Sequence, residues 1–594
     1  MKSKTEISGV KDVRLGRDIY FDAWLFSMLI DNNLAHSMNP DIIASPEQLA
    51  FMIQMDDGQV YLPCSDATFA MLHNENRHNE LQKGYNRAWR IIVRLIRSVI
   101  QEREERTRIL CFCRYRFKQY IAWHTLIPSR LVKRMTDLIL AQSLDDPWKQ
   151  RRRLSSARQM ELLESPEILA NLEAVPPDGL PLNMRQARQM LDRIELVRLL
   201  CLSAMSKELQ AQPPTTAGIR ESMQHAEKLA DALGDTFQYV GHGGTVLLLC
   251  DAEGGIVFDL FLARHLIKMG NRVIFAVKSE FYFFAPTLDD MENDPTIKPL
   301  LRDGVVLRDR RLSKKDLLHY LREHRLVVIA DGTRERLNLC RVSVAFSRAW
   351  KEADVILGKG WRAADILLGT GHDFTRDIVC FWHDEQGLHM QARKRASGAR
   401  KFSESDIIAQ SDALIERMRN ARAQAQSIMF YSCIIGSIPG ETSTAVELAH
   451  TFVNYLRSKM DNIFIINPAE HFVEGMDGDD LMFMWERVQR SGLIDTWRFQ
   501  TVKDIEESFA ILGRKVPLAW FGKDSTYSTG CTKEMHIALD VQSMNREMQI
   551  IGPEPRLFFR RGDYGVGRYF DAGINNNNRR HALSARNSCR KTEQ

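Results

Sequence analysis

The sequence predicts an α/β protein in which a helical N-terminal subdomain precedes a doubly wound, largely parallel β-sheet and a further C-terminal α/β segment. Three observations support this fold class. A short, wholly apolar run at 245–250 is typical of a strand buried on both faces of a sheet. From about 218 to 396, apolar strands alternate with helical stretches, a pattern that favours parallel strands joined by crossover helices. From about 86 to 203, the apolar residues recur at helical spacing instead.

The chain of 594 residues is too long for a single core, and breaks in its composition predict five parts. A proline-containing stretch at 212–216 separates the helical subdomain from the sheet region. The predicted parts are an N-terminal mixed segment (1–85), a helical subdomain (86–217), an α/β core (218–396), a C-terminal α/β segment (397–571) and a disordered tail (572–594).

Composition and charge narrow the classes of partner. Apolar residues make up 44% of the chain and charged residues 26%, which is ordinary for a globular protein. No apolar run approaches the ~20 residues that span a bilayer, and the polar start lacks the hydrophobic stretch of a signal peptide, so we expect no membrane partner. The ten scattered cysteines are interpreted as reduced thiols of a cytoplasmic protein. The net charge of +5 is small for this length, so we expect no nucleic-acid partner.

The helical subdomain contains a basic stripe. Arg87, Arg90, Arg94 and Arg97 recur along one face of a predicted helix, opposite a stripe of apolar residues. A stripe of this kind is most often a solvated face, and binding of an anionic partner is the alternative.

The α/β core opens with a strand–turn–helix–strand unit that places a carboxylate at one edge of the sheet. Asp251 directly follows the apolar run at 245–250, and Gly254 and Gly255 form a tight turn before an amphipathic helix. A second buried strand follows at 272–277. Open α/β sheets bind ligands at the carboxyl ends of their strands, so Asp251 is a candidate functional residue. The alternative is that Asp251 only caps the helix that follows it.

Two later strands also end in polar groups. Asp331 follows a predicted strand at 326–330, and Lys359 and Gly360 follow another at 354–358. An ammonium group at a strand end is well placed to bind a phosphate, although an exposed loop lysine is the alternative. No G-x-G-x-x-G or Walker A sequence occurs here, which argues against a dinucleotide site or a P-loop.

The C-terminal α/β segment offers three weaker signals. A glycine-containing turn at 436–444 precedes a helix, where free N–H groups attract anions. Acidic side chains and one histidine between Glu470 and Asp480 are potential ligands of a divalent ion. Cys531 lies near Lys533, and a nearby cation lowers the pKa of a thiol. Solvated loops and helix caps are the alternatives for all three.

Motifs at several places between about 240 and 365 follow one another with a characteristic order and spacing. They consist of Asp251, Ala252, Glu253, Gly254 and Gly255, then Ile256 to Asp259, then Val277 and Lys278, then Ala285, Pro286, Thr287 and Asp290, and finally Ala353, Asp354, Lys359 and Gly360. This succession resembles the metal-dependent damage-control phosphatase family, formerly a domain of unknown function and described as similar to an acidic-residue methyltransferase.

The resemblance implies a helical N-terminal subdomain, an α/β core and the removal of phosphate from reactive or misformed phosphometabolites. A phosphoric monoester hydrolase of this kind uses a divalent metal ion, of the Mg, Mn, Co or Ni class. The candidate site residues are Asp251 and Lys359 for catalysis, and Lys359, Gly360, Gly254 and Asp331 for the phosphorylated small-molecule substrate. For the metal, Asp251 is the ligand that the resemblance implies, and Asp259 and Asp290 are candidates to replace the family ligands that this chain lacks.

Two substitutions depart from the family pattern at the expected metal site. Ala252 stands where the pattern has an amide, and Ala285 stands where it has a second carboxylate. Magnesium-like ions need several oxygen ligands, so three hypotheses follow. The chain is an active phosphatase with a rebuilt metal shell, a non-catalytic descendant that binds a phosphorylated metabolite or a protein, or a protein whose separate activity lies in the C-terminal α/β segment.

Overall fold

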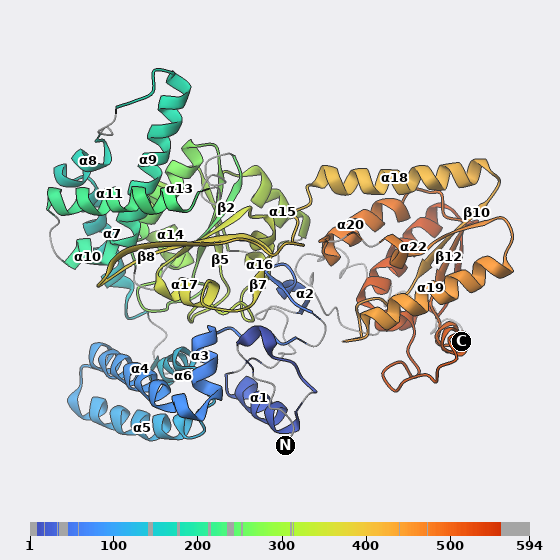
Figure 1. Ribbon diagram of the computed structural model, residues 1–594, viewed down its shortest axis with the longest axis horizontal. Helices are drawn as coiled ribbons and strands as arrows, with labels where there is room; N and C mark the ends of the chain where they lie inside the picture. Colours follow the sequence, from blue (N-terminus) through green and yellow to red (C-terminus); the bar gives the residue numbers. More distant parts are fainter. Residues whose placement is uncertain are drawn as a thin grey trace, which may run out of the picture. The chain divides into compact units, whose positions relative to one another are not determined.

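A computed structural model shows how the predicted elements are arranged (Figure 1). The structure describes residues 7, 9–16, 18–32, 34, 46–56, 59–140, 146–174, 179–211, 215–234, 243–250, 254–308, 312, 314–438, 440–471, 473 and 475–559. Asp251, Ala252, Glu253 and the predicted tail at 572–594 lie outside these residues. The chain forms two compact units, one made of residues 1–310 and 316–397 and the other of residues 311–315 and 398–594.

The first unit contains a seven-stranded sheet with the order β4-β5-β3-β2-β6-β8-β9. The first six strands run parallel, and β9 joins β8 antiparallel. The strands are β2 (Thr245–Leu249), β3 (Arg272–Val277), β4 (Gly304–Leu307), β5 (Leu326–Ala330), β6 (Val355–Lys359), β8 (Asp377–Asp384) and β9 (Gly387–Arg393). This sheet confirms the predicted fold class, and its central strands are buried along their whole length because helices cover both faces.

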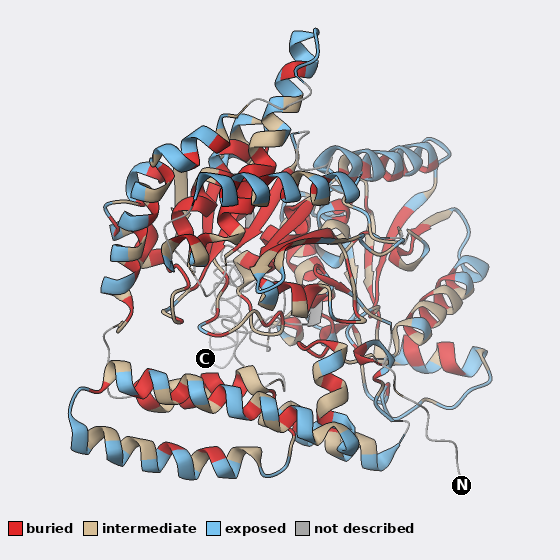
Figure 2. Ribbon diagram, turned by 60° about the vertical axis from the view of Figure 1, so that its left-hand side comes forward, coloured by how far each residue is buried: buried red, intermediate tan, exposed pale blue. Residues whose placement is uncertain are grey.

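Helices pack on the sheet through one continuous apolar core. Side chains of β2, β3, β5 and β6 pack against α9, α11 and α13 on one face, and α16 and α17 lie on the other (Figure 1). The helices of this part are α7 (Lys149–Leu163), α8 (Pro166–Leu172), α9 (Met184–Ala204), α10 (Ser206–Ala211), α11 (Thr216–Ala232), α13 (Ile256–Lys268), α14 (Leu288–Asn293), α15 (Lys314–Glu323), α16 (Val344–Glu352) and α17 (Trp361–Leu367), with a 3₁₀ turn η4 (Lys298–Leu301). Figure 2 shows the buried strands inside and the exposed sides of the helices outside.

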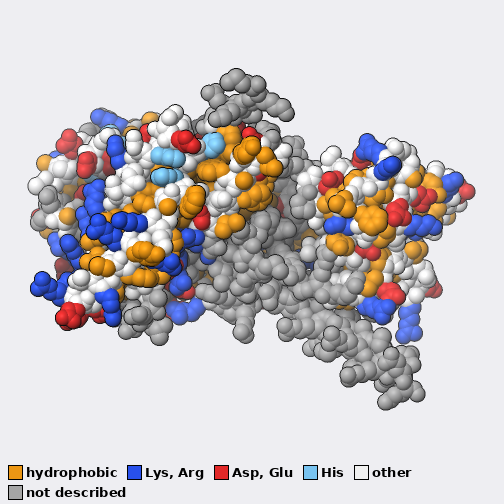
Figure 3. Space-filling model, turned by 90° about the horizontal axis from the view of Figure 1, so that it is seen from below, with side chains coloured by type: hydrophobic (Ala, Val, Ile, Leu, Met, Phe, Trp, Pro, Cys, Tyr) orange, Lys and Arg blue, Asp and Glu red, His pale blue; other side chains and the backbone are white. Residues whose placement is uncertain are grey.

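The N-terminal helices form a second core in the same unit. It is built mainly from the apolar faces of α1, α3, α4, α5 and α6. The elements are η1 (Val10–Asp12), α1 (Ile19–Asp31), α2 (Pro46–Leu49), α3 (Asp66–His73), η2 (Glu75–Arg77), α4 (His78–Val99), α5 (Arg103–Ile121) and α6 (Pro128–Leu140), and β1 (Ile53–Gln54) pairs with β7 (Asp373–Phe374). Seen from below, many Lys and Arg side chains gather over the helices α4 and α5 (Figure 3).

The second unit is a smaller α/β domain with a four-stranded parallel sheet of order β11-β10-β12-β13. Its strands are β10 (Ser427–Ser432), β11 (Ile463–Ile466), β12 (Thr496–Phe499) and β13 (Gln549–Ile551). Its helices are α18 (Glu404–Ala423), α19 (Thr442–Lys459), α20 (Gly478–Gln489), α21 (Val502–Ile511), α22 (Thr529–Met544) and α23 (Pro555–Phe558), with 3₁₀ turns η5 (Pro468–His471) and η6 (Ser525–Tyr527). The C-terminal α/β region is therefore confirmed.

The order of the strands indicates where a ligand site belongs in the first unit. After β2 the chain builds β3, β4 and β5 on one side and then crosses to β6 on the other side of β2. The carboxyl ends of β2 and β6 therefore form a topological switch point, where open parallel sheets leave a crevice. Among the described residues, no helix is long and apolar enough to cross a membrane.

Candidate functional site

A cleft of about 550 Å³ lies at the carboxyl edge of the seven-stranded sheet. Four strand ends contribute to its lining, namely Cys250 after β2, Lys278 after β3, Asp331 after β5 and Lys359 at the end of β6. Tyr282, Arg336 and Arg362 complete its polar and aromatic lining. Among the described residues, four cationic side chains and one carboxylate therefore line this cleft.

Lys359 is held at this edge by two oxygen acceptors. Its ammonium group lies 2.7 Å from Oδ1 of Asp259 and donates a 2.9 Å hydrogen bond to the carbonyl oxygen of Gly254. The residue is 4% exposed. Gly255 must be a glycine because it has a φ of +96° and because a Cβ there would lie 2.4 Å from Nζ of Lys359.

Asp259, on the first turn of α13, supports Lys359 from inside the protein. Ser203 of α9 donates a 2.5 Å hydrogen bond to Oδ1 of Asp259, which is only 1% exposed. Burial raises the pKa of the Asp259 carboxyl, and the charge of Lys359 offsets part of that shift. Oδ2 of Asp259 accepts no hydrogen bond from any residue that the structure describes.

A second buried pair repeats this arrangement at the neighbouring strand ends. Nζ of Lys278 lies 2.5 Å from Oδ2 of Asp331 and 3.0 Å from the hydroxyl of Thr333. The backbone N–H of Thr333 donates to Oδ1 of Asp331 at 2.8 Å. Burial raises the pKa of the Asp331 carboxyl, and Lys278 counteracts that shift. Each lysine of the cleft is thus anchored by one carboxylate.

The remaining predicted residues have structural contacts of their own. Gly360 has a φ of +87° and turns the chain from β6 into α17, and its N–H bonds the carbonyl of Phe381. Asp290 closes a capping box with Thr287 at the start of α14 and receives two hydrogen bonds from Arg152, of 2.8 and 3.1 Å. Asp290 and Gly254 line a separate, smaller pocket of about 290 Å³.

The described carboxylates at this edge do not fit a divalent metal ion. Asp259 is paired with Lys359, Asp331 with Lys278 and Asp290 with Arg152, so each of these carboxylates already has a cation beside it. Magnesium-like ions instead require several oxygen ligands that converge on one point. Asp251, which the resemblance implies as the central ligand, lies outside the described residues.

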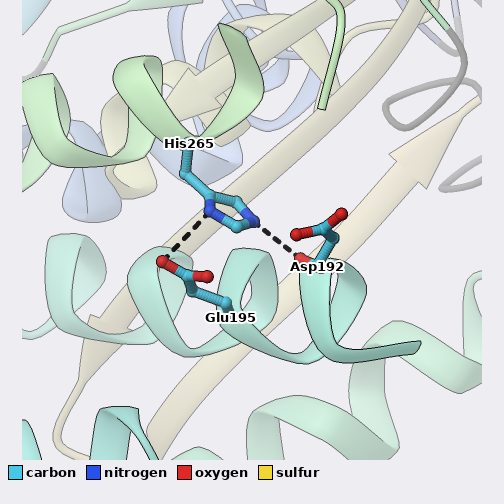
Figure 4. A group of neighbouring side chains, drawn as sticks. All are labelled: Asp192, Glu195 and His265. Carbon is cyan, nitrogen blue, oxygen red and sulfur yellow. Dashed lines mark hydrogen bonds and ion pairs between the residues drawn. The ribbon is translucent and has the colours of Figure 1, made fainter. Parts of the chain in front are cut away.

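Among the described residues, one group of three potential metal ligands lies elsewhere, between α9 and α13 (Figure 4). It contains Asp192, Glu195 and the buried His265, whose Nε2 lies 2.7 Å from the backbone oxygen of Asp192. Lys268 already places a cation beside both carboxylates, 3.0 Å from Glu195 and 3.7 Å from Asp192. The group therefore ties the two helices together as a structural ion-pair cluster.

Lys278 is a further candidate, which the sequence indicates only as part of a motif. It follows the buried strand β3 just as Lys359 ends β6, so its position at a strand end was a usable signal. Arg336 and Arg362 gave no such signal, because they reach the cleft from a loop and from α17. Arg336 stacks over the ring of Trp361 at 5.3 Å and lies 2.6 Å from Asp365.

In the second unit, the Cys531 thiol is not activated. Cys531 is 1% exposed, and burial raises the pKa of its thiol well above the usual value, opposite to the lowering that Lys533 suggested. In the acidic cluster, Glu470 is paired with Arg457 at 2.7 Å. Neither observation supports a separate activity in this unit.

Comparisons with known proteins bear on the first unit. A family model described as the damage-control phosphatase ARMT1-like domain matches residues 73–363. Among solved structures, a DUF89 family protein from Pyrococcus horikoshii is similar, with 17% sequence identity and a TM-score of 0.35 over 51% of this chain and 90% of that one. None of the curated proteins matches the chain. Residues 73–363 therefore match the damage-control phosphatase ARMT1-like domain, which confirms the resemblance expected from the sequence motifs.

Proposed function

We propose that this damage-control phosphatase-like domain binds a phosphorylated small molecule in the cleft at the carboxyl edge of the sheet. Lys278 and Lys359 would contact the phosphate. The main support for this proposal is the number of N–H groups that these two buried lysines leave unused. An ammonium group has three, and each lysine uses two of them on acceptors among the described residues. One N–H of each lysine thus remains for a ligand.

The positions of the strands support a phosphate as that ligand. Lys278 and Lys359 follow β3 and β6, which flank β2, so their backbones are about 9–10 Å apart. Two lysine side chains can span this distance around one phosphate group. Arg336 and Arg362 add two guanidinium groups to the same lining, and such groups bind phosphate oxygens in a bidentate manner. Asp259 and Asp331 hold the lysines in place.

Binding without metal-assisted hydrolysis is the function that this donor set supports best. Among the described residues, the carboxylates near this edge are engaged by Lys278, Lys359 and Arg152. The cations are therefore the groups presented to a ligand in the cleft. We keep Lys359, Gly254, Gly360 and Asp331 as substrate-site residues, with Gly254 and Asp331 acting as anchors for the two lysines.

Calorimetric titration with inorganic phosphate and with p-nitrophenyl phosphate, after treatment with EDTA, tests the proposal. We expect Lys278→Met to weaken binding about 10- to 100-fold, because a hydrogen bond to a charged group contributes about 1.5–3 kcal/mol. Lys298→Met is the matched control, since that lysine is exposed and lines none of the cavities described above. The double variant Lys359→Met/Asp259→Asn avoids an unpaired buried charge and should show the same loss. Equal affinity in all variants would refute the site.

Turnover provides the second arm of the test. We expect no hydrolysis of p-nitrophenyl phosphate with Mg²⁺, Mn²⁺, Co²⁺ or Ni²⁺ above that of Asp251→Ala. Metal-dependent hydrolysis that Asp251→Ala abolishes would show instead that the domain is an active phosphatase with a rebuilt metal shell.

A further inference from the structure

The helical hairpin formed by α4 and α5 concentrates positive charge. Residues 78–121 contain eleven Lys and Arg and only four Asp and Glu, a formal charge of +7. The whole chain carries +5, so all other residues together sum to −2. The small net charge that argued against a nucleic-acid partner is therefore an average over a strongly basic hairpin and a slightly acidic remainder.

One face of α4 is a continuous cationic stripe. Exposed cations recur every three or four residues on the side opposite the buried core, and they are Lys83, Arg87, Arg90, Arg94 and Arg97. None of them makes an ion pair with any residue that the structure describes. On a helix, a Glu or Asp three or four residues from a Lys or Arg would offset its positive charge. This stripe has no acidic residue over about 21 Å of helix.

The exposed side of α5 adds aromatic rings among further cations. Phe112 and Tyr115 are 50% and 61% exposed, although both are large rings that usually seek burial. Arg108, Arg114 and Lys118 surround them and are exposed. The two helices pack side by side, joined by three residues, and cations and apolar side chains gather over them (Figure 3).

We propose that this basic hairpin binds single-stranded nucleic acid. The α4 stripe would track the phosphates, because a ~21 Å row of cations without acidic neighbours matches a row of backbone charges. Phe112 and Tyr115 would stack on unpaired bases, which a cationic groove with aromatic platforms accommodates without sequence preference. DNA and RNA share this chemistry and are separate arms of the test.

The composition of the surface favours nucleic acid over a membrane or an acidic protein. Nine of the eleven cations are arginine, whose planar guanidinium matches phosphate oxygens. A helix that lies on a membrane needs a continuous exposed apolar face, whereas the apolar faces of α4 and α5 are used in the bundle core. An acidic protein would not require the two exposed rings between the cations.

Fluorescence anisotropy with labelled 20-nucleotide DNA and RNA single strands, and with duplex DNA, tests the proposal. We expect binding at 50 mM salt that is lost as salt rises. Arg90→Glu/Arg94→Glu/Arg97→Glu should weaken it more than about tenfold and reduce the slope against log salt by about 2, at about 0.7 per phosphate contact. The control Lys298→Glu/Arg302→Glu/Lys515→Glu makes the same charge change at exposed positions elsewhere and should bind like the unchanged protein.

A variant that lacks the two exposed rings distinguishes base stacking from charge attraction. Phe112→Ala/Tyr115→Ala should weaken single-strand binding about 5-fold or more and leave duplex binding within about twofold, because only unpaired bases stack on the rings. Circular dichroism shows whether each variant keeps its helices. No binding by the unchanged protein, equal loss in the control triple variant, or binding to phosphatidylserine vesicles but not to nucleic acid would each overturn the proposal.

Discussion

The lysines of the cleft and the cations of the α4–α5 hairpin show how strongly environment changes the role of the same charge. Lys278 and Lys359 are 8% and 4% exposed, and each is locked to a carboxylate. Arg90 and Arg94 are exposed and pair with no described residue. A buried ion costs several kcal/mol unless a partner compensates it, whereas an exposed one costs little. The cleft therefore fixes its cations in position, and the hairpin leaves them free to adapt to a flexible partner.

The largest expected difference between the two groups concerns stability. Lys359→Met leaves the buried Asp259 carboxylate without its cation and should lower the free energy of unfolding by about 3–5 kcal/mol. Arg90→Met should change it by no more than about 0.5 kcal/mol. Urea denaturation measures both, and Lys359→Met/Asp259→Asn should recover most of the loss. Similar losses in the two single variants would contradict the claim that the buried Lys359 contributes more to stability than the exposed Arg90.

In the second unit, the buried carboxyl of Glu534 differs from those of the cleft because no described cation is paired with it. Glu534 accepts a hydrogen bond from Gln489, and burial raises its pKa to about 7. Its native state therefore holds a proton that the unfolded state has lost, so stability falls as pH rises from about 4.5 to about 7, by roughly 3 kcal/mol. Hydrogen exchange in β10 and α22 at pH 5 and 7.5 measures this change. Glu534→Gln should flatten the dependence, and an unchanged slope would assign it to another group.

The close approach of Gly255 to Lys359 gives a smaller effect. Gly255→Ala adds a Cβ that would clash with Ser206 and with Nζ of Lys359, at a residue with a φ of +96°, and should cost about 2–3 kcal/mol. Gly387 has a φ of +112° but nothing within 4 Å of an added Cβ, so Gly387→Ala isolates the backbone term of about 1 kcal/mol. Thermal unfolding compares the two, and equal losses would mean that Ser206 and Lys359 move aside without cost.

The smallest effect is expected on the hairpin and has the opposite sign. Arg94 lies one turn from Arg90 and Arg97, so like charges repel along the helix. Arg94→Gln should stabilise the protein by about 0.4–1 kcal/mol at low salt, because each like-charged pair costs about 0.2–0.5 kcal/mol. At 1 M salt the gain should disappear, because screening acts within about 3 Å. Destabilisation at low salt would reveal a partner for Arg94.

The fold was predictable because its strands are short apolar runs with clear glycine turns, and local patterns of this kind survive in the final structure. Lys359 was predictable for the same reason, since it directly follows such a run. The pairing of Lys359 with Asp259 was not, because it joins residues 100 positions apart through the packing of β6 on α13. The ion pair of Asp290 with Arg152 was not predictable either, because it joins residues 138 positions apart, whereas the capping box of Asp290 with Thr287 follows from their spacing of three residues.

The two-residue connection between β8 and β9 has a consequence for the order of folding. The other neighbouring strands in this sheet are joined by crossovers, and Lys278 and Lys359 are brought together only after several such loops have closed. Closing a long loop costs more entropy than closing a hairpin, and hairpins form within about 1–10 μs. Pulsed hydrogen exchange should therefore protect β8 and β9 before β2 and β6. The cleft would then bind its ligand only after the whole sheet has formed. Ligand binding during refolding would therefore measure the last step of assembly.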